Sequence, residues 1–283
     1  MIKFNSTSEV IKLMTLLIKD FLPKQHSKIA CQTRSKCDES QLYVGIHEWG
    51  GYSMVREKNV RLINRFECGL KFQIERFVEY RGKVRVHTTV TMSESKKHEN
   101  ISFVKQNVDN FIETTNAGMD FAGYGAFFES IRNNKNAYVI LTNSSVNSIK
   151  SDFIDKYIEY MEANPDVGML GISYNSKCYQ SLMRKNFTPH LQSFFLMTTI
   201  DVLEQIVKKN GGKFPGHGIR NKQLLIREGE IKMSQIVLSL GYNLAVAQQD
   251  GFHKFDNNKL NWNLKEGDSR IGCKTPNMIW SLS

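Results

Sequence analysis

Two hydrophobic patterns alternate along this chain from residue 42 onward. Short apolar runs have the length and composition of strands, and the stretches between them repeat apolar residues at the spacing of one helix face. We expect strands at 42–46, 83–92, 137–143, 167–174 and 242–247, and a strand leading into a helix over 191–209. We expect further helices at 60–80, 101–106, 122–132, 151–163 and 231–240. This alternation predicts an α/β fold, with a twisted, mostly parallel sheet flanked by helices.

The first segment of the chain predicts an amphipathic helix that ends before Pro23. Val10, Met14, Leu17 and Phe21 recur at helical spacing, and charged residues interrupt the apolar ones. We therefore expect neither a secretion signal nor a membrane span. One role for this helix is packing on the body of the protein. The other is docking on an anionic membrane surface, which the flanking lysines favour.

The chain divides into three parts by pattern. Residues 1–40 hold the amphipathic helix and a basic linker, residues 41–250 hold the α/β domain, and residues 251–283 form an extension with little periodicity. The densest basic run, at 24–36, lacks interleaved aromatic residues. We expect this run to be a solvated surface rather than a site for single-stranded nucleic acid.

Net charge is the one unusual feature of the composition. Lys and Arg number 38 against 28 Asp and Glu, and the formal charge of +10 favours anionic partners such as nucleic acid, acidic lipid headgroups or phosphorylated ligands. The apolar share of 41% excludes a disordered chain. Five widely spaced cysteines, with no C-x-x-C pair, predict a reduced, cytoplasmic protein without a cysteine zinc site.

Ligands of open α/β sheets bind beyond the carboxyl ends of the strands. The chain has no P-loop, no G-x-G-x-x-G, no G-x-S-x-G and no H-E-x-x-H motif, so the common nucleotide and hydrolase templates are excluded. Two polar segments remain. One is a Gly-rich loop at 116–125 leading into a helix, where backbone can approach an anionic ligand. The other follows the strand at 138–142 and consists of Asn143, Ser144 and Ser145.

Four further blocks of residues follow one another along the chain. They are Asn116-x-Gly118-x-Asp120 with Tyr124, YVILTNSS, VGMLGISYN with His190-x-Gln192-Ser193, and Glu230-x-x-x-Ser234 with Gly241-Tyr242. In this order, the blocks resemble those of glycosyltransferase-like proteins of bacterial polysaccharide biosynthesis, which have the nucleotide-sugar-binding fold called GT-A. The blocks lie within residues 110–247. The resemblance implies a GT-A-like fold and the transfer of a sugar from a nucleotide-sugar donor to an acceptor hydroxyl.

The resemblance also implies roles for particular residues. Those expected to bind the donor are Asn116, Gly118, Asp120, Asn143, Ser144 and Ser145. Glu230, at the start of its predicted helix, is the candidate general base, and Glu228 is the alternative. A carboxylate in a first helical turn is also favoured by the helix dipole, so a structural role for Glu230 stays open.

Further residues are expected on the acceptor side and around the diphosphate. His190 and Gln192 precede an apolar strand and are expected to face the acceptor, although a structural histidine is equally common. His253 is considered as a metal ligand of the kind that some GT-A enzymes use. Most metal-dependent GT-A enzymes carry Asp-x-Asp where residues 143–145 here read Asn-Ser-Ser, a set that binds Mg²⁺ or Mn²⁺ poorly unless other ligands contribute. Positive side chains or helix N-termini are the alternative for neutralising the diphosphate.

Taken with the resemblance, these features predict a cytoplasmic glycosyltransferase, peripheral on the inner face of the membrane. Its product is expected to be a surface polysaccharide or glycolipid, and its acceptor a glycan or a lipid-linked glycan. Nucleic acid is not an expected partner. Two alternatives stay open. One is a catalytically inactive relative that binds nucleotide or glycan, and the other is a basic nucleic-acid-binding protein, which the charge alone suggests.

Overall fold

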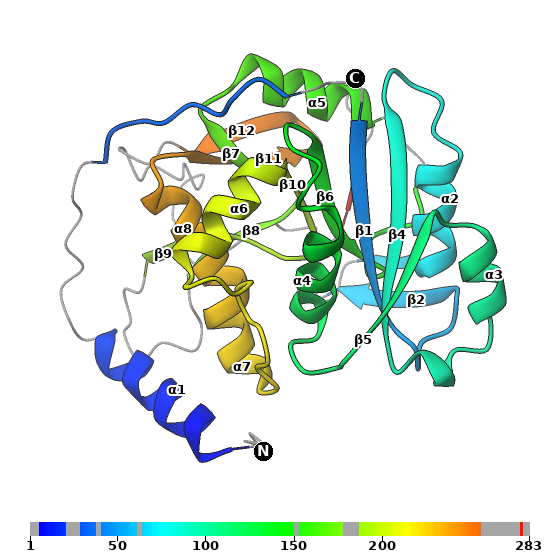
Figure 1. Ribbon diagram of the computed structural model, residues 1–283, viewed down its shortest axis with the longest axis horizontal. Helices are drawn as coiled ribbons and strands as arrows, with labels where there is room; N and C mark the ends of the chain where they lie inside the picture. Colours follow the sequence, from blue (N-terminus) through cyan, green and yellow to red (C-terminus); the bar gives the residue numbers. More distant parts are fainter. Residues whose placement is uncertain are drawn as a thin grey trace.

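An eight-stranded sheet runs through the centre of the structure, with helices on both of its faces (Figure 1). The computed structural model describes residues 6–20, 29–37, 41–60, 64–149, 153–177, 187–255 and 278–279. The strands follow one another across the sheet in the order β12 (Gly251–Phe255), β11 (Asn243–Gln248), β7 (Val167–Gly171), β10 (Phe195–Thr199), β6 (Tyr138–Asn143), β1 (Gln41–Trp49), β4 (Arg85–Ser93) and β5 (Asn110–Thr114).

Most neighbouring strands of this sheet are parallel, which confirms the predicted fold class. β1 pairs in parallel with β4 and with β6, and further parallel pairs join β4 to β5 and β7 to β11. β10 is antiparallel to both of its neighbours, β6 and β7, and β12 is antiparallel to β11. Because β1 and β6 run in the same direction, their carboxyl ends lie at the same edge of the sheet.

Alternate residues of the central strands enter two different cores. In β6, Val139 and Leu141 contribute to one core, whereas Tyr138 and Ile140 contribute to the other. The helices of the first core are α4 (Asp120–Ile131), α6 (Ile200–Lys209) and α8 (Lys232–Ser239). Those of the second core are α2 (Leu70–Val78), α3 (Ile101–Gln106) and α5 (Phe153–Ala163). Because both faces of the sheet are buried, its central strands read as nearly continuous apolar runs in the sequence.

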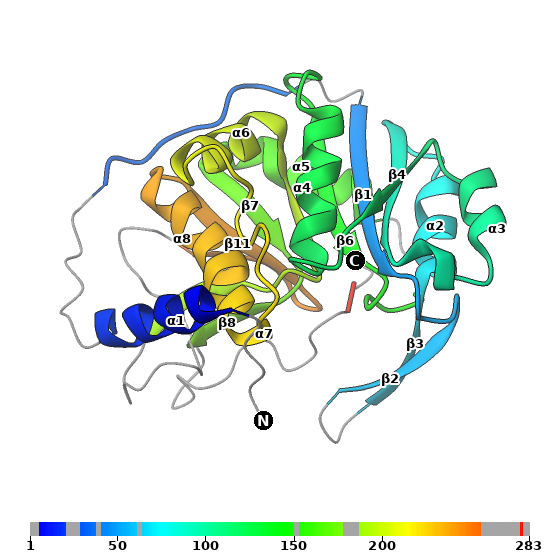
Figure 2. The ribbon, with the colours of Figure 1, turned by 60° about the horizontal axis from the view of Figure 1, so that its bottom comes forward.

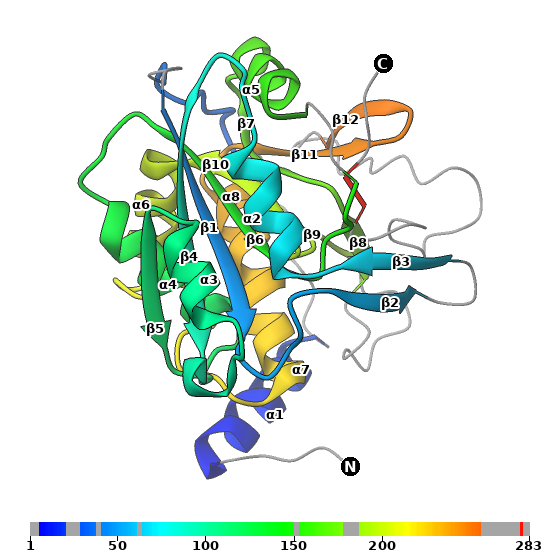
Figure 3. The same cartoon turned by 90° about the vertical axis from the view of Figure 1, so that its right-hand side faces the viewer.

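The helix expected over 60–80 is wrong in its first half. Residues Asn64–Cys68 form β3, which pairs with β2 (Arg56–Val60) in an antiparallel ribbon that projects from the body (Figure 3). Helix α2 begins only after Gly69, whose φ is 139° and whose added Cβ would lie 2.1 Å from the Met54 carbonyl oxygen. The apolar residues on the two sides of this glycine therefore belong to different elements, and their common helical spacing was accidental.

Two strands and one turn also differ from the predicted pattern. β5 forms in a segment expected to be a loop, and a short 3-10 turn, η1 (Ser95–Lys97), follows β4. The strand expected over 167–174 is divided between β7 and β8 (Tyr174–Lys177), and β8 pairs with β9 (Phe187–Leu191) in a separate two-stranded sheet. The expected start of helix α5, at 151–152, lies outside the described residues.

The last long helix begins one element earlier than expected. Its first turns are α7 (Lys222–Leu225) and a π-helical segment, η2 (Ile226–Ile231), which continue into α8. The N-cap is Asn221, whose side-chain oxygen accepts a hydrogen bond from the Leu224 backbone N–H at 3.0 Å. Gly229 and the charged residues around it hide this start in the sequence. Glu230 consequently lies about two turns inside the helix, so the expectation of a first-turn carboxylate is wrong.

The N-terminal helix, α1 (Thr7–Lys19), packs against this last long helix (Figure 2). The Arg227 guanidinium contacts both carboxylate oxygens of Asp20, at 3.0 and 2.8 Å. The Glu9 carboxylate accepts hydrogen bonds from the backbone N–H groups just before α7, and Leu13 is buried in the first core. No helix in the described ranges is long and apolar enough to cross a membrane. The expected end of the helix before Pro23 lies outside the described residues.

Most described residues of the basic linker are exposed, as expected, but Arg34 is not. Residues 29–37 run along the body, and the buried Arg34 donates hydrogen bonds to the carbonyl oxygens of Val167 and Met161. The solvated-surface prediction is therefore wrong at Arg34, because buried carbonyl groups at the end of α5 and the start of β7 need a donor. At the other end of the chain, β12 shows that the sheet continues into the expected extension, most of which lies outside the described residues.

Candidate functional site

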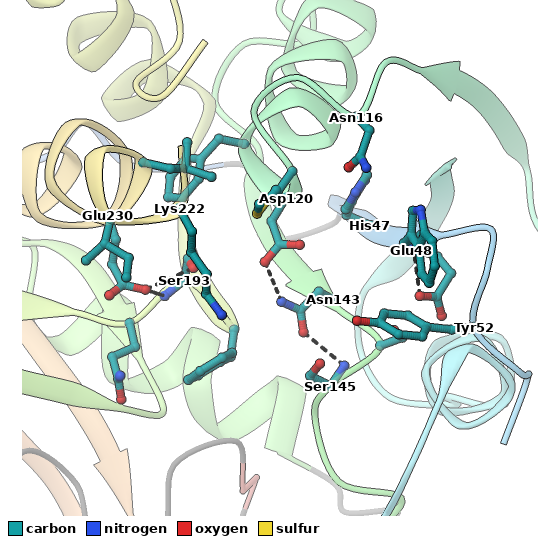
Figure 4. A pocket seen from close by; sticks show the side chains of 18 of the residues that line it. His47, Glu48, Tyr52, Asn116, Asp120, Asn143, Ser145, Ser193, Lys222 and Glu230 are labelled. Atoms are coloured by element: carbon teal, nitrogen blue, oxygen red, sulfur yellow. Dashed lines mark hydrogen bonds between the residues drawn. The ribbon is translucent and has the colours of Figure 1, made fainter. Parts of the chain in front are cut away.

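A cavity of about 570 Å³ opens at the sheet edge where β1 and β6 end (Figure 4). Its wall combines the ends of these strands, the loop before α4, the segment before β10, the ribbon and the helix that contains α7 and η2. The lining residues are His47, Glu48, Trp49, Tyr52, Lys58, Asn116, Met119, Asp120, Phe121, Asn143, Ser144, Ser145, Gln192, Ser193, Phe194, Lys222, Leu225, Ile226 and Glu230. Segments far apart in the sequence thus contribute polar groups to one space.

Five of the six residues expected to bind a donor line this cavity. The Asn143 amide donates a hydrogen bond to Asp120 Oδ2 at 2.7 Å, and Asn143 Oδ1 accepts one from the Ser145 backbone N–H at 2.9 Å. Asp120 is the first residue of α4, and the turn before it includes Gly118 with a φ of 114°. Gly118 does not line the cavity, but its conformation is one that a residue with a side chain rarely adopts. These hydrogen bonds hold the strand end and the glycine-rich loop together.

Glu230 faces this cluster from the opposite wall. The Ser193 backbone N–H and hydroxyl both donate to Glu230 Oε2, at 2.8 and 3.0 Å. Burial raises the pKa of Glu230 to about 7, although the two hydrogen bonds from Ser193 oppose the increase, and the negative charge of Asp120 adds to it. A carboxyl group in this state exchanges its proton near neutral pH and has a fixed orientation.

Glu228 occupies a different environment, although it is only two residues away. It does not line the cavity, and its Oε2 lies 2.9 Å from Lys12 Nζ and 3.3 Å from Lys232 Nζ. Burial would raise the pKa of Glu228, but hydrogen bonds and charge from the two lysines lower it below its ordinary value. Of the two candidate bases, only Glu230 faces the cavity.

Of the two residues expected on the acceptor side, only Gln192 lines the cavity. Its side-chain oxygen accepts a hydrogen bond from the Ser173 hydroxyl. His190 is buried behind Glu230, with Nε2 3.7 Å from Glu230 Oε1 and Nδ1 2.6 Å from the Thr188 carbonyl oxygen. Burial lowers the pKa of His190 to about 4, so its ring is neutral at pH 7. His190 therefore lies next to Glu230 but does not line the cavity.

The side chains at the end of β6 do not form a set suited to Mg²⁺ or Mn²⁺. Asn143 Oδ1 already accepts a backbone N–H, and the Ser144 hydroxyl accepts a hydrogen bond from Arg56 Nη2 at 2.7 Å. His253 is half-exposed on β12, away from the cavity lining, and its Nε2 lies 2.8 Å from Asp250 Oδ1. Among the described residues, no group of three or more His, Cys, Asp or Glu side chains is arranged to hold a metal ion.

Sequence reasoning missed the contribution of β1 to the cavity. Glu48 is 1% exposed, and its Oε1 accepts a hydrogen bond from the Trp49 N–H at 2.9 Å. Burial raises the pKa of Glu48 to about 7, and Arg56, whose Nη1 lies 3.4 Å from Oε2, opposes the increase. Its neighbour His47 is also buried, with Nδ1 3.1 Å from Thr91 Oγ1. A carboxylate at the end of an apolar strand was the available signal, because such strands end at the ligand edge.

The ribbon is the other contribution that the sequence did not indicate. β2 brings Arg56 beside Ser144 and Lys58 into the cavity wall, where Lys58 Nζ lies 5.2 Å from the centre of the Phe194 ring. The Arg56 guanidinium lies 4.1 Å from the centre of the exposed Tyr52 ring. These residues were overlooked because a helix was expected in this region and no strand was expected before it.

One protein family matches the chain. The sequence model described as "RgpF: Rhamnan synthesis protein F" matches residues 88–260. This range includes most of β4, the loop before α4, the end of β6 and the helix with Glu230. No curated protein matches the chain.

Several solved structures resemble the chain at low sequence identity. CMP:2-keto-3-deoxy-manno-octonic acid synthetase complexed with CTP is 12% identical, with a TM-score of 0.43, and the match covers 75% of this chain and 92% of that one. The bifunctional IspDF from Campylobacter jejuni is 11% identical over 74% of this chain and 50% of its own, with a TM-score of 0.41. Mouse xyloside xylosyltransferase 1, in its apo form, is 6% identical over 70% and 81% of the respective chains, with a TM-score of 0.34.

Proposed function

Because this chain belongs to the rhamnan synthesis protein F family, we propose that it is a glycosyltransferase of surface polysaccharide or glycolipid synthesis. It transfers a sugar from a nucleotide-sugar donor to a hydroxyl of a glycan or lipid-linked glycan acceptor. The observation that carries the proposal is the cavity in which Glu230, with a pKa of about 7, faces the cluster of Asp120 and Asn143. A proton acceptor and a set of directional hydrogen-bonding groups are what such a transfer requires.

In the proposed reaction, Glu230 is the general base. The acceptor oxygen forms a bond to the anomeric carbon of the donor sugar, and the bond from that carbon to the phosphate oxygen breaks. The nucleoside diphosphate leaves with the electron pair, and the acceptor proton moves to the Glu230 carboxylate. Ser193 holds the base in place through its two hydrogen bonds to Oε2. A pKa of about 7 allows Glu230 to be ionised before the reaction and to keep a proton after it.

On the donor side, Asn116, Asp120 and the residues at 143–145 bind the nucleotide sugar. Asp120 Oδ2 accepts the hydrogen bond from Asn143 at 2.7 Å, so the other carboxylate oxygen of Asp120 keeps a fixed direction toward a sugar hydroxyl. A preorganised set of this kind favours one sugar orientation over others.

The first experiment combines donor binding with transfer. Thermal unfolding is followed with UDP, GDP, CDP, dTDP and CMP and their common sugars, and transfer is then measured with the donor that stabilises the protein. A ligand at 100 times its Kd raises the free energy of unfolding by about 2.7 kcal/mol. Selective stabilisation by one nucleotide sugar, followed by transfer, supports the proposal. Binding without transfer to any acceptor supports an inactive, nucleotide-binding relative instead.

Two variants on the same helix test the base. Glu230→Gln keeps the size of the side chain and its contact with Ser193 but removes the proton acceptor, so we expect a loss of transfer of about 10²–10⁴-fold with donor binding retained. Glu228→Gln is the matched control, since Glu228 does not line the cavity. Full activity of Glu230→Gln would move the role of base to another group.

We further propose that α1 rests on the inner face of the cytoplasmic membrane. Ile11, Met14 and Ile18 are 62, 57 and 66% exposed and follow the spacing of one helix face, opposite to the buried Leu13. Lys19 directly follows Ile18 in the sequence, and the chain carries a charge of +10. An exposed apolar stripe on a basic protein is suited to an anionic lipid surface, where a lipid-linked acceptor would also lie.

A further inference from the structure

Two lysines from separate elements line the cavity. Lys58 comes from β2 in the projecting ribbon, and Lys222 is the first residue of α7. Lys222 extends into the space between Glu230 and Asp120 (Figure 4). Burial lowers the pKa of Lys58, and the charges of Asp120 and Lys222 also act on it. The two ammonium groups therefore share one electrostatic environment with the polar cluster at the end of β6.

Neither of these lysines contacts a carboxylate within the part of the chain that the structure describes. Other described lysines do form ion pairs with carboxylates, namely Lys12, Lys71, Lys83, Lys97, Lys232 and Lys254. Lys58 is half-buried, so holding its charge without a counterion destabilises the unliganded protein, and an anionic ligand removes this cost. Lys222 is exposed and adds a second positive charge to the same cavity. The pair Lys58 and Lys222 is thus suited to a ligand with more than one negative charge.

A third cation, Arg56, lies on the same strand as Lys58. Arg56 donates to the Ser144 hydroxyl at 2.7 Å and lies 3.4 Å from Glu48 Oε2. The guanidinium therefore sits against the turn at the end of β6. Because Lys58 is two residues from Arg56 on β2, both side chains project from the same face of the ribbon.

We infer that Lys58 and Lys222 bind the diphosphate of the donor nucleotide and supply the positive charge that stabilises it as it leaves. This inference rests on the proposed glycosyltransferase function. When the bond between the anomeric carbon and the phosphate oxygen breaks, the diphosphate gains negative charge, and the two ammonium groups offset it. Arg56 is a positioning residue, which holds the strand end through Ser144 and balances Glu48.

The test measures binding by titration calorimetry in the presence of EDTA. The probes are inorganic pyrophosphate, the diphosphates UDP, GDP, CDP and dTDP, and the corresponding uncharged nucleosides. We compare the wild type with Lys58→Gln and Lys222→Gln, and the control is Lys135→Gln, which removes the same charge from an exposed turn. Lys58→Arg restores the charge at the first position. Thermal unfolding without ligand verifies that each variant is folded.

We expect the wild type to bind pyrophosphate and one nucleoside diphosphate in EDTA. Each glutamine variant should weaken both by about tenfold, which corresponds to about 1.4 kcal/mol, since a hydrogen bond to a charged group contributes about that much or more. Nucleoside affinity should stay unchanged, Lys135→Gln should match the wild type, and Lys58→Arg should recover most of the loss. In transfer assays the glutamine variants should lower kcat to a similar extent with or without Mn²⁺.

Two results would overturn the inference. One is unchanged diphosphate affinity in both glutamine variants, and the other is diphosphate affinity that disappears in EDTA and returns with Mn²⁺. If sugar transfer persists in either case, the proposed function stands without this role for the lysines. If pyrophosphate binding depends on both lysines but no nucleotide sugar is ever turned over, the anion site stands and the proposed function fails.

Discussion

Burial decides which carboxyl groups of this protein can exchange a proton near neutral pH. Glu48 and Glu230 come from strand β1 and from the helix on the other side of the cavity, and each is held by a hydrogen bond from a backbone N–H. In both, removal from water raises the pKa to about 7. Glu228, two residues from Glu230, has a lowered pKa because lysines surround it. Neighbours in sequence thus differ in their acid–base chemistry.

This difference predicts opposite pH effects on stability in two variants. The pKa of Glu230 rises from 4.5 in the unfolded chain to about 7 in the folded one, so the folded state binds the proton more tightly and wild-type stability falls as pH rises through this window. Glu230→Gln has no such group to ionise, so its stability should not fall with pH at this position. At about 1.4 kcal/mol per pKa unit, we expect the variant to gain up to about 3 kcal/mol relative to the wild type between pH 5 and pH 8.

Chemical denaturation at pH 5, 6, 7 and 8 measures this gain, and Glu228→Gln provides the opposite control. The pKa of Glu228 is lowered on folding, so its ionised form stabilises the protein above the unfolded pKa and this contribution is lost as pH falls. Glu228→Gln should therefore be less stable than the wild type at pH 7 and approach it at low pH. A difference between Glu230→Gln and the wild type that stays constant with pH would contradict the prediction.

Close packing between α4 and the first strands places the glycine-rich loop at the cavity. Two glycines permit this approach. An added Cβ at Gly45 of β1 would lie 2.3 Å from the Phe127 ring, and one at Gly123 of α4 would lie 2.1 Å from His47 Nδ1. Both distances are far shorter than any real contact between these atoms. Because neither glycine has a side chain, α4 packs closely against the strands, and its first residue, Asp120, lies next to the strand ends.

Gly123→Ala should consequently lower both stability and activity. The added methyl group must displace His47 and Thr91 or move α4, and overpacking of this kind costs about 1–3 kcal/mol. Because His47 lines the cavity, we also expect weaker donor binding. Denaturant unfolding and donor titration measure the two effects. Gly125→Ala in the same helix is the control, since its Cβ would meet only Phe214 at 3.2 Å, and a gain in helix propensity of about 1 kcal/mol offsets this.

The N-terminal helix connects the exposed surface of the molecule with the helix that contains Glu230. Its inner side contacts that helix through Glu9, Lys12 and Asp20, and its outer side presents Ile11, Met14 and Ile18. If the apolar stripe rests on a membrane, the cavity is held near lipid-linked molecules without a membrane-spanning segment. The net charge of +10 then adds a long-range attraction to anionic lipids, which salt weakens.

This arrangement predicts binding to vesicles of phosphatidylglycerol and phosphatidylcholine, and weaker binding as salt increases. Replacing Ile11, Met14 and Ile18 together by Ser should lower the vesicle partition at least tenfold, since burying each apolar side chain contributes about 1.5–3 kcal/mol. The free energy of unfolding should change little, because these side chains are exposed. Vesicle flotation makes the measurement. A triple Ser variant at the exposed Val78, Phe103 and Ile149, which lie on other elements, should float as the wild type does.

Local patterns were enough to predict most of the sheet and its covering helices. The strands at β1, β4, β6, β7 and β11 are apolar because both faces of the sheet are buried, and this signal lies within a few consecutive residues. The polar residues at the end of β6 and in the loop before α4 were also predicted from short stretches of sequence. Asn116, Asp120 and residues 143–145 were predicted to share one site, and the structure brings them together in the cavity wall.

The sequence by itself therefore determined the fold class, the position of the ligand edge and much of the polar side of the cavity. Only the tertiary structure decided between Glu230 and Glu228, because exposure and ion pairing depend on α1, β9 and the segment before β10. It also brought Lys58 and Lys222 to the same cavity, and Arg34 to the carbonyl oxygens of Val167 and Met161. These contacts join residues far apart along the chain, and no local spacing of apolar and polar positions encodes them. The periodicity of apolar residues indicates which face of a helix or strand is buried, but the packing of the elements decides which residues that face contacts.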